Sequence, residues 1–169
     1  MIKIKPSINC AAAALTVLCA MPAWSKCLET GVQLQILGSG GPGAASGRAS
    51  SGYLLWVDGV SRVMVDAGSG TKDQFHQAGA NSADIKLVAL SHLHPDHSAE
   101  LPAIFWPDGG SFSVSGPSGA GVFPSIEKFL TLMFEPNGVY SVLGPRLDLD
   151  VISVDAMAET PTQVWQEGS

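Results

Sequence analysis

The feature that most limits what this chain can become is a cluster of histidines near its middle. His92, His94 and His97 are three of the four histidines in the sequence, and Asp96 lies among them. Imidazole nitrogen and carboxylate oxygen are ligands that suit zinc and similar divalent metals. The cluster directly follows residues 85–90, an apolar stretch typical of a buried strand. The sequence therefore predicts a metal site on a tight loop at the end of a strand.

The spacing of these residues determines how they can reach a metal ion. His92 and His94 are two positions apart, so in an extended segment their side chains project to the same side. Pro95 prevents a continuous strand or helix through the cluster, and we expect Asp96 and His97 to face the site from another direction. This arrangement can present one pair of ligands to each of two metal ions, as two-metal hydrolytic sites require. A polar surface loop with a chance cluster of histidines is the alternative.

The segment Ser91–His97 resembles the H-x-H-x-D-H signature of the metallo-β-lactamase superfamily. Val63–Gly68 is similar to an earlier strand of that family, which ends in Asp and Gly. Ile36–Pro42 resembles the opening strand and glycine turn of the branch that contains ribonuclease Z, arylsulfatases and class II cyclic-nucleotide phosphodiesterases. Val114–Pro117, followed by a helix, is similar to this branch as well. The resemblance covers residues 32–135, and its central motif is the specific part.

The resemblance implies an α/β fold of the αββα sandwich type, in which two β-sheet halves pack face to face with helices outside. It implies that His92 and His94 bind a first divalent metal and that His97 binds a second. Asp96 would hold the second metal and steer the proton of the attacking water, the catalytic role. Two zinc ions per complete site are the implied cofactor. Asp66 would orient the metal loop through hydrogen bonds, and a simple strand-end aspartate is the alternative.

Chain length conflicts with a complete sandwich. The superfamily fold usually needs more residues than the 169 present, and no histidine follows His97. The family supplies its remaining ligands from later strands. Asp148, Asp150 and Asp155 lie in the right direction, but no motif around them supports a carry-over. We therefore expect the N-terminal half of a larger domain, with an apolar sheet face left open for aggregation or pairing.

Residues 1–25 are typical of a signal peptide. Two lysines form a basic start, residues 10–21 are an apolar run, and residues 23–25 are a small-x-small cleavage site. The run is too short to span a bilayer comfortably, and a signal anchor is the alternative. We expect a periplasmic or secreted protein with residues 26–169 as the hydrolase domain. Stable membrane insertion is not expected after cleavage.

Charge and cysteine content bear on partners. Without Lys3 and Lys5 of the leader, seven Lys and Arg face fifteen Asp and Glu, a formal charge of −8. Because phosphate backbones attract clustered Lys and Arg, this balance predicts no nucleic acid partner. Cys27 is the one cysteine after the leader, so no internal disulfide can form. The expected partners are a small-molecule ester and, through the open sheet face, a second copy of the chain.

Hydrophobic periodicity predicts the other elements. Strands are expected over residues 32–37, 52–57, 62–65, 111–114 and 147–154, and helices over residues 69–78 and 126–133. Asp58-Gly59 predicts a hairpin turn. His76 is expected on the polar, solvated face of its helix. Ile104, Phe105 and Trp106 either wall a substrate pocket or pack in the core.

These features favour an exported metal-dependent hydrolase in which metal-activated water cleaves a phosphodiester or sulfate ester. A lactone or β-lactam ranks below these substrates. The order depends on the resemblance to one branch, and similar folds host many reactions. The alternative is a non-catalytic metal-binding protein, or an inactive half-domain that needs a partner chain, because the later ligands are missing.

Overall fold

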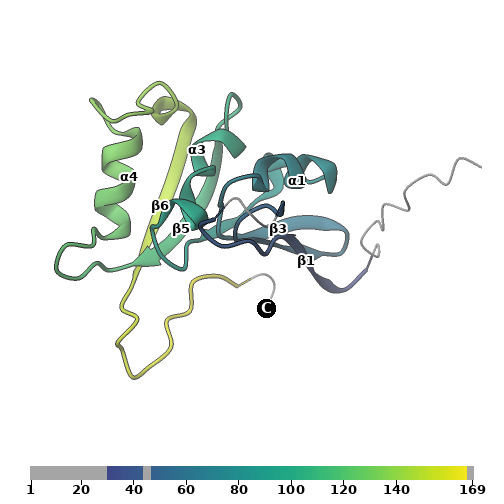
Figure 1. The fold of residues 1–169 in the computed structure, drawn as a ribbon, viewed down its shortest axis with the longest axis horizontal. Helices are drawn as coiled ribbons and strands as arrows, with labels where there is room; N and C mark the ends of the chain where they lie inside the picture. Colours follow the sequence, from purple (N-terminus) through teal and green to yellow (C-terminus); the bar gives the residue numbers. More distant parts are fainter. Residues whose placement is uncertain (1–29, 44–46, 167–169) are drawn as a thin grey trace, which may run out of the picture.

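The computed structural model describes residues 30–43 and 47–166, which form one mixed sheet with helices on one of its faces (Figure 1). The predicted signal peptide lies outside the described residues. The six strands follow one another across the sheet in chain order. They are β1 (Val32–Gly38), β2 (Gly52–Val57), β3 (Val60–Val65), β4 (Leu87–Ala89), β5 (Gly110–Pro117) and β6 (Leu147–Val154).

The first three strands form an antiparallel meander. β2 and β3 are joined by Asp58 and Gly59, which both have positive φ (49° and 75°), as a two-residue hairpin turn of the right twist requires. The Asp58 Oδ1 atom also accepts a hydrogen bond from the Gly31 amide at 2.8 Å. The predicted hairpin is confirmed, and β3 begins at Val60 rather than Arg62.

The other half of the sheet is parallel: β3, β4, β5 and β6 pair in the same direction. Short helices connect these strands: α1 (Thr71–Gln77), η2 (Ser82–Asp84), α2 (Pro95–Ser98), α3 (Leu101–Ile104), α4 (Ile126–Phe134) and η3 (Gly144–Arg146). The carboxyl ends of all four parallel strands consequently meet at one edge of the sheet. In sheets of this kind that edge is where ligands bind.

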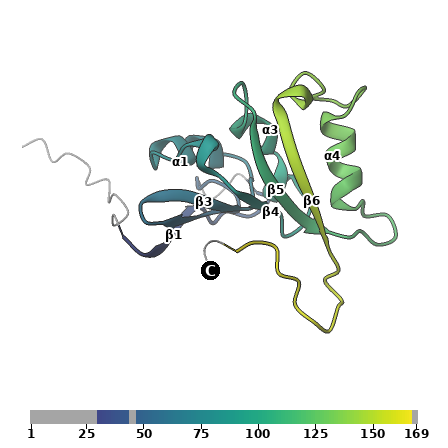
Figure 2. The ribbon, with the colours of Figure 1, turned by 180° about the vertical axis from the view of Figure 1, so that it is seen from behind.

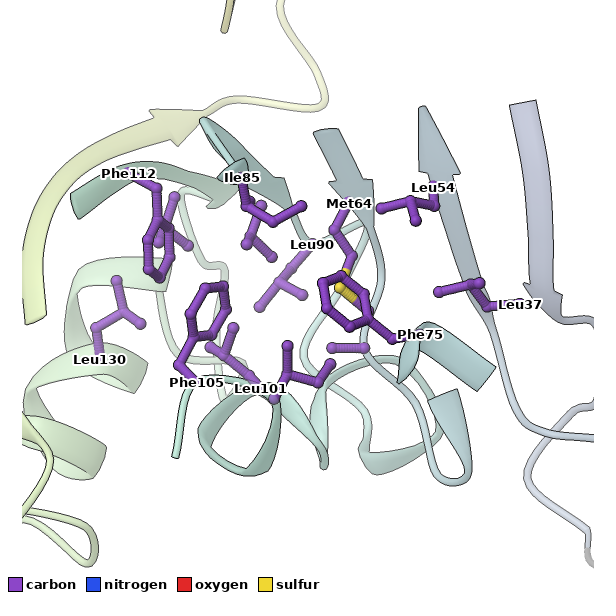
Figure 3. Packing of buried hydrophobic residues seen from close by; sticks show 14 of the residues in the cluster. Leu37, Leu54, Met64, Phe75, Ile85, Leu90, Leu101, Phe105, Phe112 and Leu130 are labelled. Carbon is purple, nitrogen blue, oxygen red and sulfur yellow. The ribbon is translucent and has the colours of Figure 1, made fainter. Parts of the chain in front are cut away.

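One hydrophobic core lies between the helices and the sheet (Figure 3). Phe75 of α1, Leu101 of α3 and Leu130 of α4 are buried against sheet residues such as Met64 and Phe112. All helices that supply the core therefore cover the same face of the sheet, as Figure 2 shows from behind. None of the helices in the described ranges is long and apolar enough to cross a membrane.

The segment after α3 belongs to the core. Ile104 and Phe105 are buried, and the Phe105 ring stacks on Phe112 with centroids 4.1 Å apart. Trp106 is 47% exposed and borders a different cavity from the histidine cluster. Core packing is confirmed for Ile104 and Phe105, whereas Trp106 borders a cavity. His76 is exposed on α1, as expected.

The opposite face of the sheet carries exposed apolar side chains. Val32, Leu34 and Ile36 alternate along β1, and Leu34 is 62% exposed. They lie directly across from Val57, Leu55 and Tyr53 of β2 and share a face with them. Residues 30–43 and 47–166 contain no second sheet to cover this face. The described residues thus form one α-and-β half of the predicted αββα sandwich.

Candidate metal site

The histidine cluster lies at the edge where the parallel strands end. β4 stops at Ala89, and the chain then passes through residues 90–94 into α2, which begins at Pro95. The prediction of a loop through the whole cluster is therefore wrong for Asp96 and His97, which lie on this one-turn helix. Pro95 occupies the first helical position, where its missing N–H would have had no helical partner.

The predicted site residues converge. The rings of His92 and His97 have centroids 3.9 Å apart, and those of His92 and His94 are 4.7 Å apart. Asp96 Oδ2 lies 3.5 Å from His97 Nε2. His94 is exposed and the other three are half-buried. The structure therefore brings together all four residues predicted to bind metal, at a position open to solvent.

Asp66 lies beneath the cluster and holds it by hydrogen bonds. Its buried side chain follows β3 directly, and its backbone has a left-handed φ of 58°, a conformation that aspartate tolerates better than most residues. Asp66 Oδ2 lies 2.7 Å from His97 Nδ1. Since a carboxylate accepts, His97 Nδ1 donates to it, and Nε2 is the ring nitrogen on the side of Asp96. Asp66 contacts the ring rather than the open side of the site, and this is the geometry of an orienting residue.

Two serines that sequence reasoning missed complete this arrangement. The Ser91 amide donates to Asp66 Oδ1 at 2.8 Å, and the Ser91 hydroxyl donates to Asp66 Oδ2 at 3.0 Å. The Ser51 hydroxyl donates to the same Oδ2 at 2.8 Å. Ser91 Oγ also lies 3.2 Å from Nδ1 of both His92 and His97. Ser91 adjoins the histidine motif and could have been inferred from it, whereas no local pattern marks Ser51.

Backbone hydrogen bonds hold residues 91–97, the metal loop, against the segment that follows β3. The Ala67 amide donates to the His97 carbonyl at 2.7 Å, and the Ser51 amide donates to the Asp96 carbonyl at 3.1 Å. A Cβ atom on Gly68 would lie well inside van der Waals contact with the Asp96 carbonyl oxygen. This close approach explains why position 68 is a glycine.

Glu100, two positions after α2, links the metal loop region to α1. Its Oε1 accepts from the Gly70 amide at 2.8 Å, and its Oε2 accepts from the Lys72 amide at 2.6 Å. Glu100 thus satisfies free N–H groups at the start of α1. It ties the segment after Asp66 to the helices that follow the metal loop.

The donor set fits a divalent metal, although the described residues contain only part of a ligand sphere. Partial burial, and then the neighbouring rings of His97 and His94, hold the pKa of His92 below its usual range. This favours the neutral imidazole that binds metal. Within residues 30–43 and 47–166, no three His, Cys, Asp or Glu side chains are already arranged as a metal-binding group. His92, His94, Asp96 and His97 are therefore suitable in chemistry and proximity, and further ligands would complete the sphere.

The three aspartates considered as further ligands, Asp148, Asp150 and Asp155, lie in two different places. Asp148 and Asp150 lie on β6 and accept hydrogen bonds from Ser111 and Ser113 of β5, at 2.9 and 3.3 Å, along the sheet. Asp155 follows the end of β6 and lines a cavity together with His92 and His94. Only Asp155 therefore shares the edge with the histidines.

This cavity measures about 500 Å³ and is bounded by the ends of β5 and β6, by α4 and by the metal loop. Its other lining residues include Pro117, Phe123, Phe129 and Met157. The histidines thus border a concave surface large enough for a small organic group, and ligand cavities of roughly 300–1,000 Å³ are the usual size.

Part of the sequence is similar to known proteins. A sequence model of the family described as Anti-Pycsar protein Apyc1 matches residues 32–106. Ribonuclease Z of Thermobifida fusca is 38% identical over 72 residues, which cover 43% of this chain and 22% of that protein. Ribonuclease Z of Nocardia farcinica is 40% identical over 73 residues, which cover 43% of this chain and 23% of that protein.

Solved structures share the fold. Human tRNase Z, short form, superposes with a TM-score of 0.57 at 21% identity and covers 75% of this chain and 47% of that chain. The metallo-β-lactamase fold protein YhfI from Bacillus subtilis gives a TM-score of 0.53 at 22% identity, with 79% and 49% coverage. The chain spans about half the length of these structures.

The fold is therefore the metallo-β-lactamase fold of these solved structures, represented over about half of their length. Over 72 to 73 residues the sequence is ribonuclease Z-like, and these residues cover less than a quarter of the ribonuclease Z chains that they match. Its named relatives are hydrolases.

These relatives correct one prediction. The acidic composition was taken to exclude nucleic acid, yet the similar proteins are ribonucleases and a tRNase. The exclusion is wrong because net charge averages over the whole surface. At a metal site the bound cations themselves are the largest local positive charges, so phosphate recognition there does not require clustered Lys and Arg.

Proposed function

We propose that this chain is a metal-dependent hydrolase that cleaves phosphodiester bonds. The observation that carries the proposal is the convergence of His92, His94, Asp96 and His97 above a buried carboxylate, Asp66. The names of the relatives, ribonuclease Z and tRNase Z, support phosphodiesters as the substrate class. Zinc is the proposed metal, since two or more imidazoles with a carboxylate suit it.

Each residue has a proposed task. His92 and His94 would hold a first ion, and His97 and Asp96 would hold a second; a divalent ion bound there would supply ionised water at neutral pH. Asp66 keeps the Nδ1 proton of His97 in place, so that Nε2 faces the site. Asp96 lies beside Nε2 of His97 and is placed to accept the proton of the attacking water.

Export and sulfate ester cleavage are finer proposals. The basic start, apolar run and small-x-small site of residues 1–25 support export to the periplasm or outside the cell. Sulfate esters share with phosphodiesters a tetrahedral centre whose oxygens can be polarised, and they form the second substrate arm of the test below.

A non-catalytic metal-binding protein, or a half-domain that needs a partner chain, is the second candidate. It is favoured by the incomplete ligand group within the described residues. The two candidates differ in whether the metal-loaded chain turns over substrate alone.

The experiment has two readouts on the purified full chain. Elemental analysis measures bound zinc, and rates are measured on bis(4-nitrophenyl) phosphate, 4-nitrophenyl sulfate and an aryl lactone. We expect bound zinc and phosphodiester turnover that is lost in His94→Ala and kept in His76→Ala, a matched exposed histidine outside the cluster. Bound zinc without turnover supports the second candidate. Less than one ion per chain, or full activity in His94→Ala, contradicts the proposed site.

A further inference from the structure

We propose that the cavity beside His92 and His94 binds a flat, uncharged ring of the substrate, so that the preferred esters carry such a ring next to the scissile bond. This inference rests on the proposed function, since it names the substrate class of the same site. It starts from Phe123, whose ring centroid lies 6.2 Å from that of His94.

Phe123 is held at the cavity although solvent reaches it. Its side chain is 62% exposed, which is unusual for a large aromatic residue in a segment fixed by hydrogen bonds. The Ala120 amide donates to the Phe123 carbonyl at 3.1 Å, and the Phe123 amide donates to the Ala120 carbonyl at 3.0 Å. The tight turn therefore presents the ring at the cavity edge instead of allowing it to fold into the core.

The other walls are also apolar. Phe129 contributes from α4, Pro117 from the end of β5 and Met157 from the segment after β6. A flat ring placed among them would contact Phe123 on one side and a polarizable thioether on another, and both contacts are favourable for aromatic groups. Because His94 borders Phe123, a ring in this cavity lies next to the bond presented to the histidines.

Charge selects against an anionic ring. Asp155 is the one charged side chain apart from the histidines that lines this cavity among the described residues, and no Lys or Arg does so. Its Oδ1 accepts from the Met157 amide at 2.9 Å, which holds the carboxylate at the cavity. A carboxylate or sulfonate on the ring would be repelled there, whereas a neutral ring would not.

The test measures binding to the full chain rather than turnover. The probes are phenyl methylphosphonate, methyl methylphosphonate, 4-carboxyphenyl methylphosphonate and a uridine methylphosphonate, titrated into zinc-loaded protein while the NMR signals of the His94 ring are followed. We expect the phenyl ester to bind roughly 2- to 12-fold more tightly than the methyl ester, the range that corresponds to one aromatic pair. The uridine ester separates a nucleobase from a phenol as the source of the ring.

Three variants complete the experiment. Phe123→Ala should abolish the advantage of the phenyl ester without changing methyl ester binding, and Val122→Ala, a neighbour in the same turn that does not line the cavity, should keep it. Asp155→Asn should tighten binding of the 4-carboxyphenyl ester alone. Equal affinities for phenyl and methyl esters, or an unchanged preference in Phe123→Ala, would overturn the inference.

Failure of the proposed function is distinguishable from failure of this inference. Neutral phenol titrated into metal-free protein tests the cavity by itself. Phenol that shifts the His94 signals in the parent chain and not in Phe123→Ala supports the ring site even if the chain holds no zinc. Phenol that shifts nothing, in a chain that does hold zinc and hydrolyses esters, removes the ring site and leaves the proposed function intact.

Discussion

His97 Nδ1 donates to Asp66 Oδ2 over 2.7 Å, and this pair joins the end of β3 to the metal loop that follows β4. The bond fixes the orientation of the ring and occupies Nδ1, so Nε2 is the nitrogen available to a metal ion. The carboxylate is buried and also accepts from Ser91 and Ser51. The ring is thus positioned before any ligand arrives.

Asp66→Asn should weaken zinc binding by roughly 10- to 100-fold, the usual effect of removing a hydrogen-bond partner of a metal-binding histidine. Asparagine tolerates the left-handed backbone at this position, so the variant removes the charge with little strain. Competition titration with a chromophoric chelator measures the affinity. Asp73→Asn on the exposed side of α1 is the control, and equal affinities in both variants would contradict the orienting role.

Gly68→Ala should destabilise the fold by about 1–3 kcal/mol, the usual effect of inserting a methylene where none fits. The added Cβ meets the carbonyl oxygen of Asp96, so the metal loop must move away from β3. Urea denaturation measures the free energy of unfolding. Gly41→Ala, where a Cβ meets no atom within 4 Å, should leave that free energy unchanged.

Glu100→Ala should cost about 0.5–2 kcal/mol of stability, as loss of a helix cap does. Glu100→Gln should lose less stability than Glu100→Ala, since one oxygen can still accept from an amide. Amide hydrogen exchange at Gly70 and Lys72 should accelerate in Glu100→Ala, because both amides lose their acceptor. Glu135→Ala is the control variant. Unchanged exchange at Gly70 and Lys72 in Glu100→Ala, together with an equal loss of stability in Glu135→Ala, would contradict the role of Glu100 in stabilising the start of α1.

Leu34→Lys should reduce self-association of the chain. Leu34 lies on the edge strand β1, on the open apolar sheet face, where a charge would oppose contact with a second sheet. Analytical ultracentrifugation of the parent and variant chains gives the measurement. Leu132→Lys on exposed α4 is the matched control, and a parent chain that is monomeric at all concentrations would remove the expectation of a homo-oligomer.

In metal-free protein, the pKa of His92 should lie below the usual range of histidine, because burial and then the rings of His97 and His94 disfavour its charged form. A depressed folded-state pKa means that the unfolded chain takes up the proton first. The effect of His92 on the free energy of unfolding is therefore most favourable above the pKa of the unfolded state. It declines as the pH falls from that value toward the pKa of the folded state. NMR titration of the folded chain and of the chain in urea checks the direction. Equal values in the two states would contradict it.

Local patterns predicted the elements whose signals lie within the element itself. Residues 147–154 alternate, and β6 has the predicted bounds; Asp58-Gly59 specifies its turn through two positive φ angles. The helical character of residues 95–98 was missed because Pro95 was interpreted as a break, although proline is compatible with a first helical position. A proline alone cannot distinguish a stop from a start.

The residues of the candidate site likewise divide into those with a local sequence signal and those without one. The histidine motif is local and was found, and Asp66 was inferred from the family resemblance. Ser51 and Glu100 act through hydrogen bonds to residues 15 to 30 positions away, so no pattern of near neighbours reveals them. The prediction about nucleic acid depended on net charge, which carries no information on where a phosphate group would lie.

At the edge where the parallel strands end, the residues of the histidine cluster and the residues of the cavity wall come from different segments. The loop after β4 is locked to the end of β3 through Gly68 and Asp66, while the turn at residues 120–123 and the segment after β6 project from neighbouring strands without such a clamp. Changes in those two outer segments can therefore alter which molecules the cavity accepts while His92, His94, Asp96 and His97 keep their arrangement. A scaffold of this kind can diversify its selectivity by mutation at its periphery without rebuilding the histidine cluster.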